Sequence, residues 1–297
     1  MDDVLRVGVI GAGRVGAVLA HALRAAGHPV TAAAGESDAS RSRAAALLPG
    51  VPLAKPTVVA KACDILLLTV PDDMLANVVT QLAAAGALHP GQCVVHTSGR
   101  HGLDVLAPAR EVGARVIALH PAMTFSGTDI DLPRLANCVF GVTADESDRA
   151  WVEGVAEELG GIAMWVPESK RTLYHAGLAH GANHLVTLVS QAMEILSSSG
   201  AEDPAAVLRP LLSAALDNAL AHGDAALTGP IVRGDAETVA AHLAELDRTN
   251  PEAVASYVAL AGDTLDRAVT DGRLLPIRAA KIRRVLAGAQ SPARTRA

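Results

Sequence analysis

Short, continuous apolar runs alternate with longer Ala-rich stretches over the first half of the chain. The run ILLL at residues 65–68 is a typical example, because it is apolar on both faces of an extended segment. Such runs indicate strands covered on both faces, and their alternation with helical stretches predicts a parallel sheet. The expected strands are residues 5–10, 30–34, 64–70, 92–97, 115–120, 138–142 and 162–166.

A different pattern begins after Pro167. The following sequence has the periodicity of long helices and no strand-like run. The clearest of these helical stretches are residues 205–221, 236–246 and 251–269. We therefore predict an α/β domain of residues 1–167, with a doubly wound parallel sheet, and an all-α domain of residues 168–290. The polar segment 291–297 is expected to be a disordered tail.

Composition narrows the classes of function. Of the 297 residues, 50% are hydrophobic and 2% are aromatic, so each domain can bury a core made mainly of Ala, Val and Leu. The formal net charge of −6 gives no electrostatic reason to expect a nucleic-acid partner. No apolar run approaches the roughly 18 residues of a membrane span. The acidic start MDDVLRVGVI also lacks the features of a signal peptide.

The cysteines agree with an intracellular location. Cys63, Cys93 and Cys138 are odd in number and far apart in the sequence. This distribution fits buried thiols in a reducing compartment better than disulfides or a zinc site. We therefore expect a cytoplasmic protein without a membrane partner.

A glycine-rich segment follows the first expected strand directly. In LRVGVIGAGRVG the glycines of a G-x-G-x-x-G pattern are Gly11, Gly13 and Gly16, and a helix-like run comes next. The first glycine permits a tight turn, the second lets a pyrophosphate approach the backbone, and the third allows the helix to pack closely on the strand. This strand–loop–helix context predicts a Rossmann dinucleotide-binding site. Its expected residues are Gly11, Ala12, Gly13, Arg14, Val15 and Gly16.

The residues after the second expected strand bear on the choice of dinucleotide. NAD-binding sites usually have an acid at this strand end to hold the ribose hydroxyls, but Ala34 stands here. Ser37, Arg41 and Arg43 could instead hold the 2′-phosphate of NADP, because Arg matches phosphate oxygens well. Glu36 argues for NAD, since it would repel a phosphate. We predict NADP as the cofactor, with NAD as the alternative.

Polar residues also follow the third and fourth expected strands. The backbone at Thr69, Val70 and Pro71 is expected to pass the nicotinamide side of the cofactor, and Thr97 to contact it from the next strand. Local turn capping is the alternative role for the Thr69 side chain.

Two further strand-end residues are candidates for the substrate side of the same crevice. Ser98 follows the fourth expected strand and is a candidate for substrate binding or for turn capping. His120 ends the fifth expected strand in LHPAMTF, where Pro121 restricts the chain and thereby aims the histidine.

Several segments together resemble the family of Rossmann-like proteins that carry the domain of unknown function 2520. The resemblance covers roughly residues 5–285 and rests on VGVIGAGRVG, LLLTVPDD, VVHTSGRHG, LHPAMTF, YHAGLAHGANHLVTL and LTGPIVRGD. That family is related to the 6-phosphogluconate-dehydrogenase-like enzymes, which combine an N-terminal dinucleotide domain with a helical C-terminal domain. Some members are similar to ketopantoate reductases, so the resemblance implies reduction of 2-oxopantoate with NADPH. LHPAMTF is also similar to a stretch of prephenate dehydrogenases.

The chain departs from the wider superfamily at one position. Many relatives have a catalytic Lys followed four residues later by Asn on the first interdomain helix. Asn183 matches that Asn, but the residue four positions earlier is Ala179. The superfamily proton donor is therefore missing or replaced.

The stretch LYHAGLAHGANHLVTL at residues 173–188 sets three histidines in an apolar helical pattern. At 100° per residue, His180, Asn183 and His184 fall within about 60° of each other, and His175 lies close to the same face. No third ligand accompanies the i,i+4 histidines, so no metal site is predicted. Reduction of a carbonyl needs a hydrogen-bond donor and a proton, which Asn183 and one of His175, His180 or His120 could supply. The alternative is that each histidine only satisfies local hydrogen bonds.

The segment LTGPIVRGD at residues 227–235 offers groups for an anionic substrate. Arg233 is the candidate cation and Thr228 a second substrate ligand, while Asp235 suits the N-cap of the next helix. Gly177 and Gly181 give a smooth stripe on the preceding helix, suited to close approach of the cofactor domain or of a partner helix. A homodimer through the helical domain is expected.

The leading hypothesis is an NADP-dependent oxidoreductase that acts on a small 2-oxo or 2-hydroxy acid. One alternative, implied by the resemblance of LHPAMTF, is a prephenate-dehydrogenase-like oxidoreductase, and two others remain. The absent lysine would also fit a non-catalytic NADP-binding sensor or assembly partner, and a similar fold accommodates a deazaflavin hydride carrier.

Overall fold

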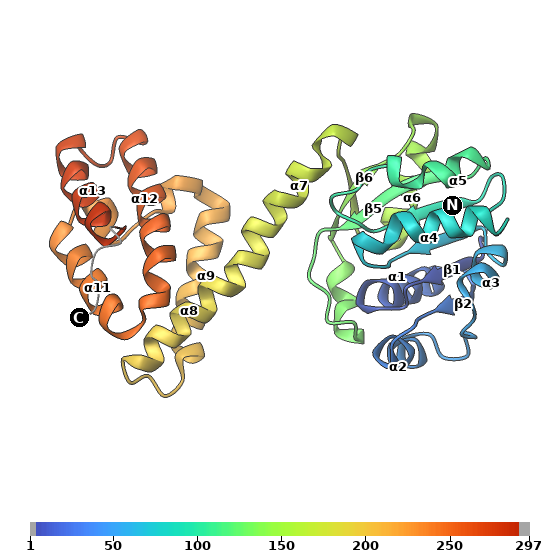
Figure 1. Cartoon of the computed structure of the whole chain (residues 1–297), viewed down its shortest axis with the longest axis horizontal. Helices are drawn as coiled ribbons and strands as arrows, with labels where there is room; N and C mark the ends of the chain where they lie inside the picture. The colour runs from blue at the N-terminus through green and yellow to red at the C-terminus, as the bar shows by residue number, and fades with distance from the viewer. Residues whose placement is uncertain (1–3, 291–297) are drawn as a thin grey trace. The chain divides into compact units, whose positions relative to one another are not determined.

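The computed structural model describes residues 4–290, which form two compact units (Figure 1). One unit ends at Gly181 and the other begins at Ala182. The last strand ends at Trp165, close to the predicted boundary at 167/168, but helix α7 (Arg171–Leu178) is part of the first unit. The predicted tail, 291–297, lies outside the described residues.

The first unit contains a seven-stranded sheet in the order β2-β1-β3-β4-β5-β6-β7. The strands are β1 (Val7–Ile10), β2 (Val30–Ala34), β3 (Ile65–Leu68), β4 (Cys93–His96), β5 (Arg115–Pro121), β6 (Val139–Thr143) and β7 (Ile162–Trp165). All seven predicted strands are confirmed. The chain passes from β1 to β2 on one side and to β3 on the other, so a topological switch point lies between β1 and β3. Ligands of doubly wound sheets bind at such a point.

One strand pair departs from the predicted all-parallel sheet. β5 and β6 are antiparallel, with His120 opposite Gly141. A parallel pair needs a crossover, usually an α-helix, whereas the connection between β5 and β6 contains only two short 3₁₀ turns, Asp129–Asp131 and Pro133–Leu135. The chain therefore returns along the same edge in the opposite direction.

Helices cover both faces of the sheet, as the apolar strands require. One face packs against α1 (Arg14–Ala25), α2 (Asp38–Leu47) and α6 (Arg149–Glu158). The other face packs against α3 (Pro56–Lys61), α4 (Asp72–Ala84) and α5 (Ala107–Glu111). Successive residues of β3 alternate between the two cores, because side chains along a strand point to opposite faces.

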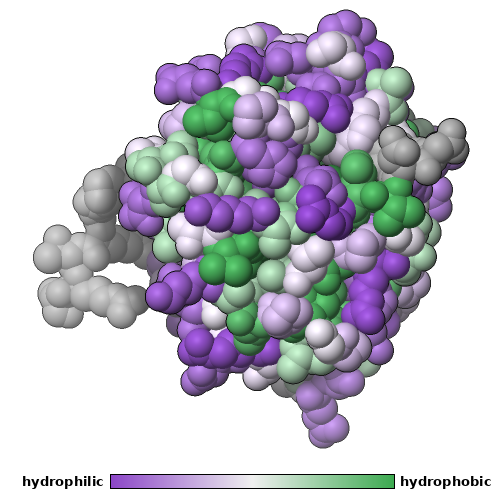
Figure 2. Space-filling view, turned by 90° about the vertical axis from the view of Figure 1, so that its right-hand side faces the viewer, coloured by the Kyte–Doolittle hydropathy of each residue, from purple (hydrophilic) through white to green (hydrophobic). Residues whose placement is uncertain are grey.

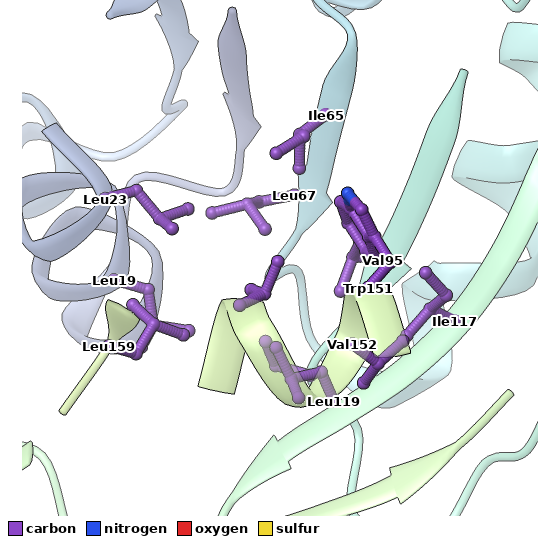
Figure 3. Close-up of a pocket in the computed structure, with 12 residues that line it drawn as sticks. Leu19, Leu23, Ile65, Leu67, Val95, Ile117, Leu119, Trp151, Val152 and Leu159 are labelled. Atoms are coloured by element: carbon purple, nitrogen blue, oxygen red, sulfur yellow. The ribbon is translucent and has the colours of Figure 1, made fainter. Parts of the chain in front are cut away.

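The core under α1 and α6 encloses a small void (Figure 3). Its volume is about 10 Å³, and leucine, isoleucine and valine side chains from both helices and from β3, β4 and β5 point toward it. A space of this size could hold one water only if polar partners lined it. The lining is almost entirely apolar, so the void is a packing defect and not a ligand site.

In the second unit, the described residues 182–290 form helices and no strand. The α-helices are α8 (His184–Ser198), α9 (Pro204–His222), α10 (Pro230–Arg233), α11 (Ala236–Thr249), α12 (Val254–Thr270) and α13 (Pro276–Gln290). Residues of α10 to α13 form its core, including Val239, Leu265 and Ile282, which are fully buried. Asp235 caps α11 by accepting a hydrogen bond from the Thr238 N–H at 3.1 Å, as predicted.

Apolar side chains gather inside each unit, while the surface is mixed. On the face shown in Figure 2, small hydrophobic patches lie among hydrophilic side chains. Among residues 4–290, no helix combines the length and the apolar character that crossing a membrane would require. Cys63, Cys93 and Cys138 are free and buried, which confirms the prediction of buried thiols.

Candidate functional site

The glycine loop joins β1 to α1 through a turn that only glycine adopts easily. Gly11 has φ +97°, and the N–H groups of Gly11 and Ala12 both donate to the Ala34 carbonyl at 2.9 Å. A Cβ on Gly11 would lie 2.7 Å from the Thr69 carbonyl carbon, and one on Gly16 would lie 2.5 Å from the Gly11 carbonyl oxygen. The turn and the close helix packing predicted from these two glycines are therefore present.

Gly13 differs from its two neighbours in the motif. A Cβ there would meet only the Gly11 carbonyl oxygen, at 3.8 Å, and its φ of −81° suits any residue. The fold itself therefore does not require glycine at this position. The open space lies at the N-terminus of α1, where free N–H groups and the helix dipole favour an anion.

A pocket of about 670 Å³ opens beside this loop, at the carboxyl ends of β1, β3 and β4. The predicted cofactor residues that line this pocket are Gly11, Gly13, Arg14, Val15, Ser37, Thr69, Val70, Pro71 and Thr97. Ser98, predicted for substrate, completes the wall after β4. Ala12 and Gly16 do not line the pocket, because they face the protein interior. The Thr69 hydroxyl donates to the Gly11 carbonyl at 2.6 Å, so this side chain holds the loop.

The residues predicted for a 2′-phosphate occupy different positions. Ser37 lines the pocket and caps α2 by accepting from the Ser40 N–H at 3.1 Å. Arg41 does not line the pocket and pairs with Asp38 at 3.3 Å. Arg43 lies beside Gly127, in the connection between β5 and β6. Arg14 is the arginine that lines the pocket, on the same wall as Glu36.

His96, at the end of β4, has a structural role. Its Nδ1 accepts from the Ser98 N–H at 3.1 Å, so its Nε2–H donates to the Gly102 carbonyl at 2.9 Å. Burial lowers the pKa of His96 to about 4. The neutral imidazole therefore shapes the loop that carries Ser98, whose hydroxyl accepts from the His101 N–H at 3.1 Å.

His120 lies beside this loop, in contact with α7. Its Nδ1 is 2.9 Å from the hydroxyl of Tyr174, and the rings of the two residues meet edge to face. Burial lowers the pKa of His120 to about 4, with Arg171 and His175 adding to the effect. At neutral pH the imidazole is uncharged, so His120 can donate a hydrogen bond but does not supply a proton as an imidazolium.

The start of α7 is tied to the loop after β4 at two points. The Glu168 carboxylate accepts from the Leu103 N–H at 2.9 Å, and Nη2 of Arg171 donates to the Ser98 carbonyl at 2.6 Å. These ties bring His175 against Gly99, where a Cβ would lie 2.5 Å from the imidazole Cδ2. His175 is also edge-on to His120, with ring centroids 6.0 Å apart. The structure thus brings Ser98, His120 and His175 together, as the sequence predicted.

Arg171 and Tyr174 are the members of this cluster that sequence reasoning missed. Tyr174 stands in the histidine-rich stretch 173–188, but its hydrogen-bond partner, His120, is 54 positions away in the sequence. Arg171 follows a run of charged residues and has the pattern of an exposed helix start, yet it is buried. The signal available was the rarity of tyrosine, since the chain has two.

A π-helical turn, Ala179–Asn183, follows α7 and changes the predicted geometry of the histidines. His180, Asn183 and His184 are exposed in the described chain. A π turn contains more residues than an α-helical turn, so the predicted 100° spacing does not hold here, although such turns often mark functional positions. Among the described residues, no group of three or more His, Cys, Asp or Glu is arranged to hold a metal.

The predicted anion ligands lie in the second unit. Thr228 and Arg233 are exposed, Thr228 just before α10 and Arg233 at its end. Arg233 lines an open depression with Arg273, Arg278 and Lys281, together with the acidic Asp235 and Glu237. Both residues remain predictions for substrate binding.

Comparison with known proteins identifies both parts of the chain. Residues 2–121 match the model of a Rossmann-like domain, and residues 138–264 match the domain of unknown function DUF2520. No curated protein matches the chain significantly.

Solved structures share the fold. A protein from Bacteroides fragilis assigned as an NADP oxidoreductase is 19% identical, with a TM-score of 0.76 over 89% of this chain and 98% of its own. A reductive aminase from Aspergillus terreus, solved with NADPH and ethyl levulinate, is 19% identical, with a TM-score of 0.64 over 95% and 99%. Pyrroline carboxylate reductase from Plasmodium falciparum, solved with NADP bound, is 12% identical, with a TM-score of 0.56 over 94% and 98%. The chain thus carries a Rossmann-like domain over residues 2–121, followed by a DUF2520 domain over residues 138–264.

Proposed function

We propose that this protein is an NADP-dependent oxidoreductase that transfers a hydride between NADPH and the carbonyl group of a small 2-oxo acid. The observation that carries the proposal is the 670 Å³ pocket, which is lined both by the glycine loop and by the strand-end residues Thr97 and Ser98. Similar folds solved with NADP or NADPH support the choice of cofactor.

The residues present fit a dinucleotide. The open space at Gly13 and the N-terminus of α1 suit the pyrophosphate. Arg14 and Ser37 would hold a 2′-phosphate, whereas the negative charge of Glu36 would weaken its binding. NADPH should therefore bind more tightly than NADH, but only by a modest factor. Backbone at Thr69, Val70 and Pro71 would follow the other end of the cofactor.

The chemistry of the remaining residues fits reduction of a carbonyl. NADPH, when bound, supplies the hydride. Neutral His120 would donate a hydrogen bond to the carbonyl oxygen as negative charge develops on it, a role that needs no ionised imidazole. Within the same unit, His175 is a further candidate for a hydrogen-bond donor and Ser98 for binding the substrate.

Cofactor binding and turnover test the proposal in two stages. We expect NADPH to raise the melting temperature of the protein, and NADPH absorbance to fall when the right 2-oxo acid is added. The substrate panel should start with 2-oxopantoate and include other 2-oxo acids and the cyclic imine 1-pyrroline-5-carboxylate. Turnover of the imine alone would move the reaction from C=O to C=N reduction. Binding without any turnover would favour the non-catalytic sensor, and absence of binding would refute both.

The second unit supports a proposal for assembly. α8 has no buried residue, and α9, which packs against it, also exposes apolar side chains. The most exposed of these are Val186 at 66%, Leu211 at 64% and Leu220 at 80%. Exposed apolar side chains on two helices that pack together suit a protein interface. We infer a homodimer through α8 and α9.

Replacing Leu211 and Leu220 together by glutamate should convert this dimer to a monomer. Two buried charges in an apolar interface are too costly to retain without partners. Light scattering after size-exclusion chromatography gives the mass directly. Exchange of the equally exposed Leu275, which lies outside both helices, for glutamate is the control and should leave the mass unchanged. A wild-type protein that is monomeric at high concentration would refute the inference.

A further inference from the structure

A buried arginine without a carboxylate partner lies next to the Tyr174–His120 pair. Arg171 is 1% exposed, and its hydrogen bonds go to neutral acceptors, the carbonyls of Ser98 and Gly141 and the hydroxyl of Thr143. Its Nε has no hydrogen-bond partner. A buried cation costs several kcal/mol unless a negative charge offsets it. The arrangement would therefore stabilise a negative charge that forms close by.

A neighbouring group able to acquire such a charge during a reaction is the phenol of Tyr174. The guanidinium carbon of Arg171 lies 6.0 Å from the centre of the Tyr174 ring. The Gly141 backbone, like Arg171, lowers the pKa of Tyr174. Burial is the larger effect and raises this pKa, so the phenol keeps its proton at neutral pH. Tyr174 is thus an acid whose conjugate base has two stabilising contacts.

Tyr174 and His120 share one hydrogen bond, in which the phenol oxygen lies 2.9 Å from Nδ1 of His120. With the phenol as the donor of this bond, Nδ1 is its acceptor. His120 then carries its proton on Nε2. That nitrogen lies 3.0 Å from the position of a Cβ on Gly99, the residue after pocket-lining Ser98. A chain of two exchangeable protons therefore runs from Tyr174 to the loop after β4, whose Ser98 lines the 670 Å³ pocket.

We propose that Tyr174 and His120 form a proton relay that replaces the missing superfamily lysine, with Arg171 as its counter-ion. This inference rests on the proposed function. As the carbonyl carbon gains a hydride, its oxygen takes the proton from Nε2 of His120. Nδ1 of His120 takes the proton of Tyr174, and the resulting phenolate lies beside Arg171. His120 is neutral before and after the step. A solvent proton taken up at Nε2, with return of the Nδ1 proton to the phenolate, restores both groups.

The groups around the pair agree with this resting state. Arg171, His175 and Asp72 are the charged or titratable groups that act on His120. Arg171 and Cys138 act on Tyr174. Glu168 and Asp72 act on Arg171 itself. The pKa of His120 is lowered to about 4, by burial first. The relay therefore starts from a protonated phenol and a neutral imidazole throughout the neutral range.

The tautomer of His120 tests the relay without any turnover. Nitrogen NMR of the protein with labelled histidine should show Nε2 protonated and Nδ1 unprotonated, and Tyr174→Phe should relax this preference. The chain offers a matched control, because its second tyrosine, Tyr257, also lies 2.9 Å from a histidine nitrogen, that of His242. Tyr257→Phe should leave the His120 signals unchanged. A proton found on Nδ1 of His120 in the wild type would overturn the relay, whatever the protein reduces.

Turnover gives the second test once a substrate is known. Tyr174→Phe should lower kcat about 100-fold, the usual size of an acid–base contribution, with unchanged NADPH affinity. His120→Gln should cost a similar factor, and the double variant little more, because both residues serve one path. Tyr257→Phe should keep wild-type kcat. If Tyr174→Phe also keeps wild-type kcat, the relay is wrong while the proposed oxidoreductase stands.

Discussion

Exchanging Gly13 for valine is expected to abolish NADPH binding while leaving the melting temperature of the free protein close to the wild-type value. The space around Gly13 is open in the fold, and its φ of −81° is allowed for valine. A side chain there would occupy the volume in which a pyrophosphate must approach the backbone. The expected loss of affinity is at least about 100-fold, which corresponds to about 2.7 kcal/mol. Titration calorimetry measures it directly.

Gly16→Ala is the contrasting variant. A Cβ there would lie 2.5 Å from the Gly11 carbonyl and would also clash with the Thr69 hydroxyl. Because backbone must move, the variant should lose about 1–3 kcal/mol of unfolding free energy even without cofactor. Equal free energies of unfolding for Gly13→Val and Gly16→Ala would contradict the close packing of backbone around Gly16. Full NADPH affinity in Gly13→Val would remove the glycine loop from the binding site.

Acid is expected to destabilise the first unit strongly between pH 6.5 and pH 4. His96 and His120 each have a pKa lowered from 6.5 to about 4, mainly by burial. The unfolded chain binds protons at these positions in that window and the folded chain does not, so the free energy of unfolding falls as the pH falls. Above pH 6.5 both histidines are neutral in the folded and in the unfolded chain, so their contribution to the free energy of unfolding is fully present. Each histidine accounts for about 3 kcal/mol over the whole window.

The two tryptophans allow this effect to be measured on the first unit alone. Trp151 and Trp165 both belong to it, and the chain has no others. Urea unfolding followed by tryptophan fluorescence at several pH values should give a shallower pH dependence for His96→Gln than for the wild type. The amide of glutamine can donate to the Gly102 carbonyl and accept from the Ser98 N–H without titrating. His222→Gln, in the second unit, is the control. An unchanged slope in His96→Gln would mean that this histidine titrates normally.

The strand pattern, the glycine loop and the helical second half could be read from the sequence because each depends on local chemistry. Continuous apolar runs mark β1 to β7 wherever helices cover both faces, and the turn at Gly11 is required by residues within a few positions of it. The cap at Asp235 is local in the same way. The positions of Ser98 and His120 at strand ends also follow from their distance to the apolar runs.

Other features depended on pairings that no local pattern encodes. The antiparallel direction of β6 follows from a connection without a crossover helix. Arg41 and Arg43 suited a phosphate by type, but Arg41 pairs with Asp38, Arg43 lies beside Gly127, and neither lines the pocket. The exposure of Asn183 and the π turn before α8 also differ from the regular helix that the pattern predicts.

The sequence by itself determined the fold class, the cofactor loop and the residue types available for chemistry. Only the tertiary structure brought Tyr174 to His120, and buried Arg171 behind them. The physical reason is that secondary structure and turns depend on interactions between near neighbours in the chain. A buried hydrogen bond between residues 54 positions apart exists only after the sheet and α7 have packed.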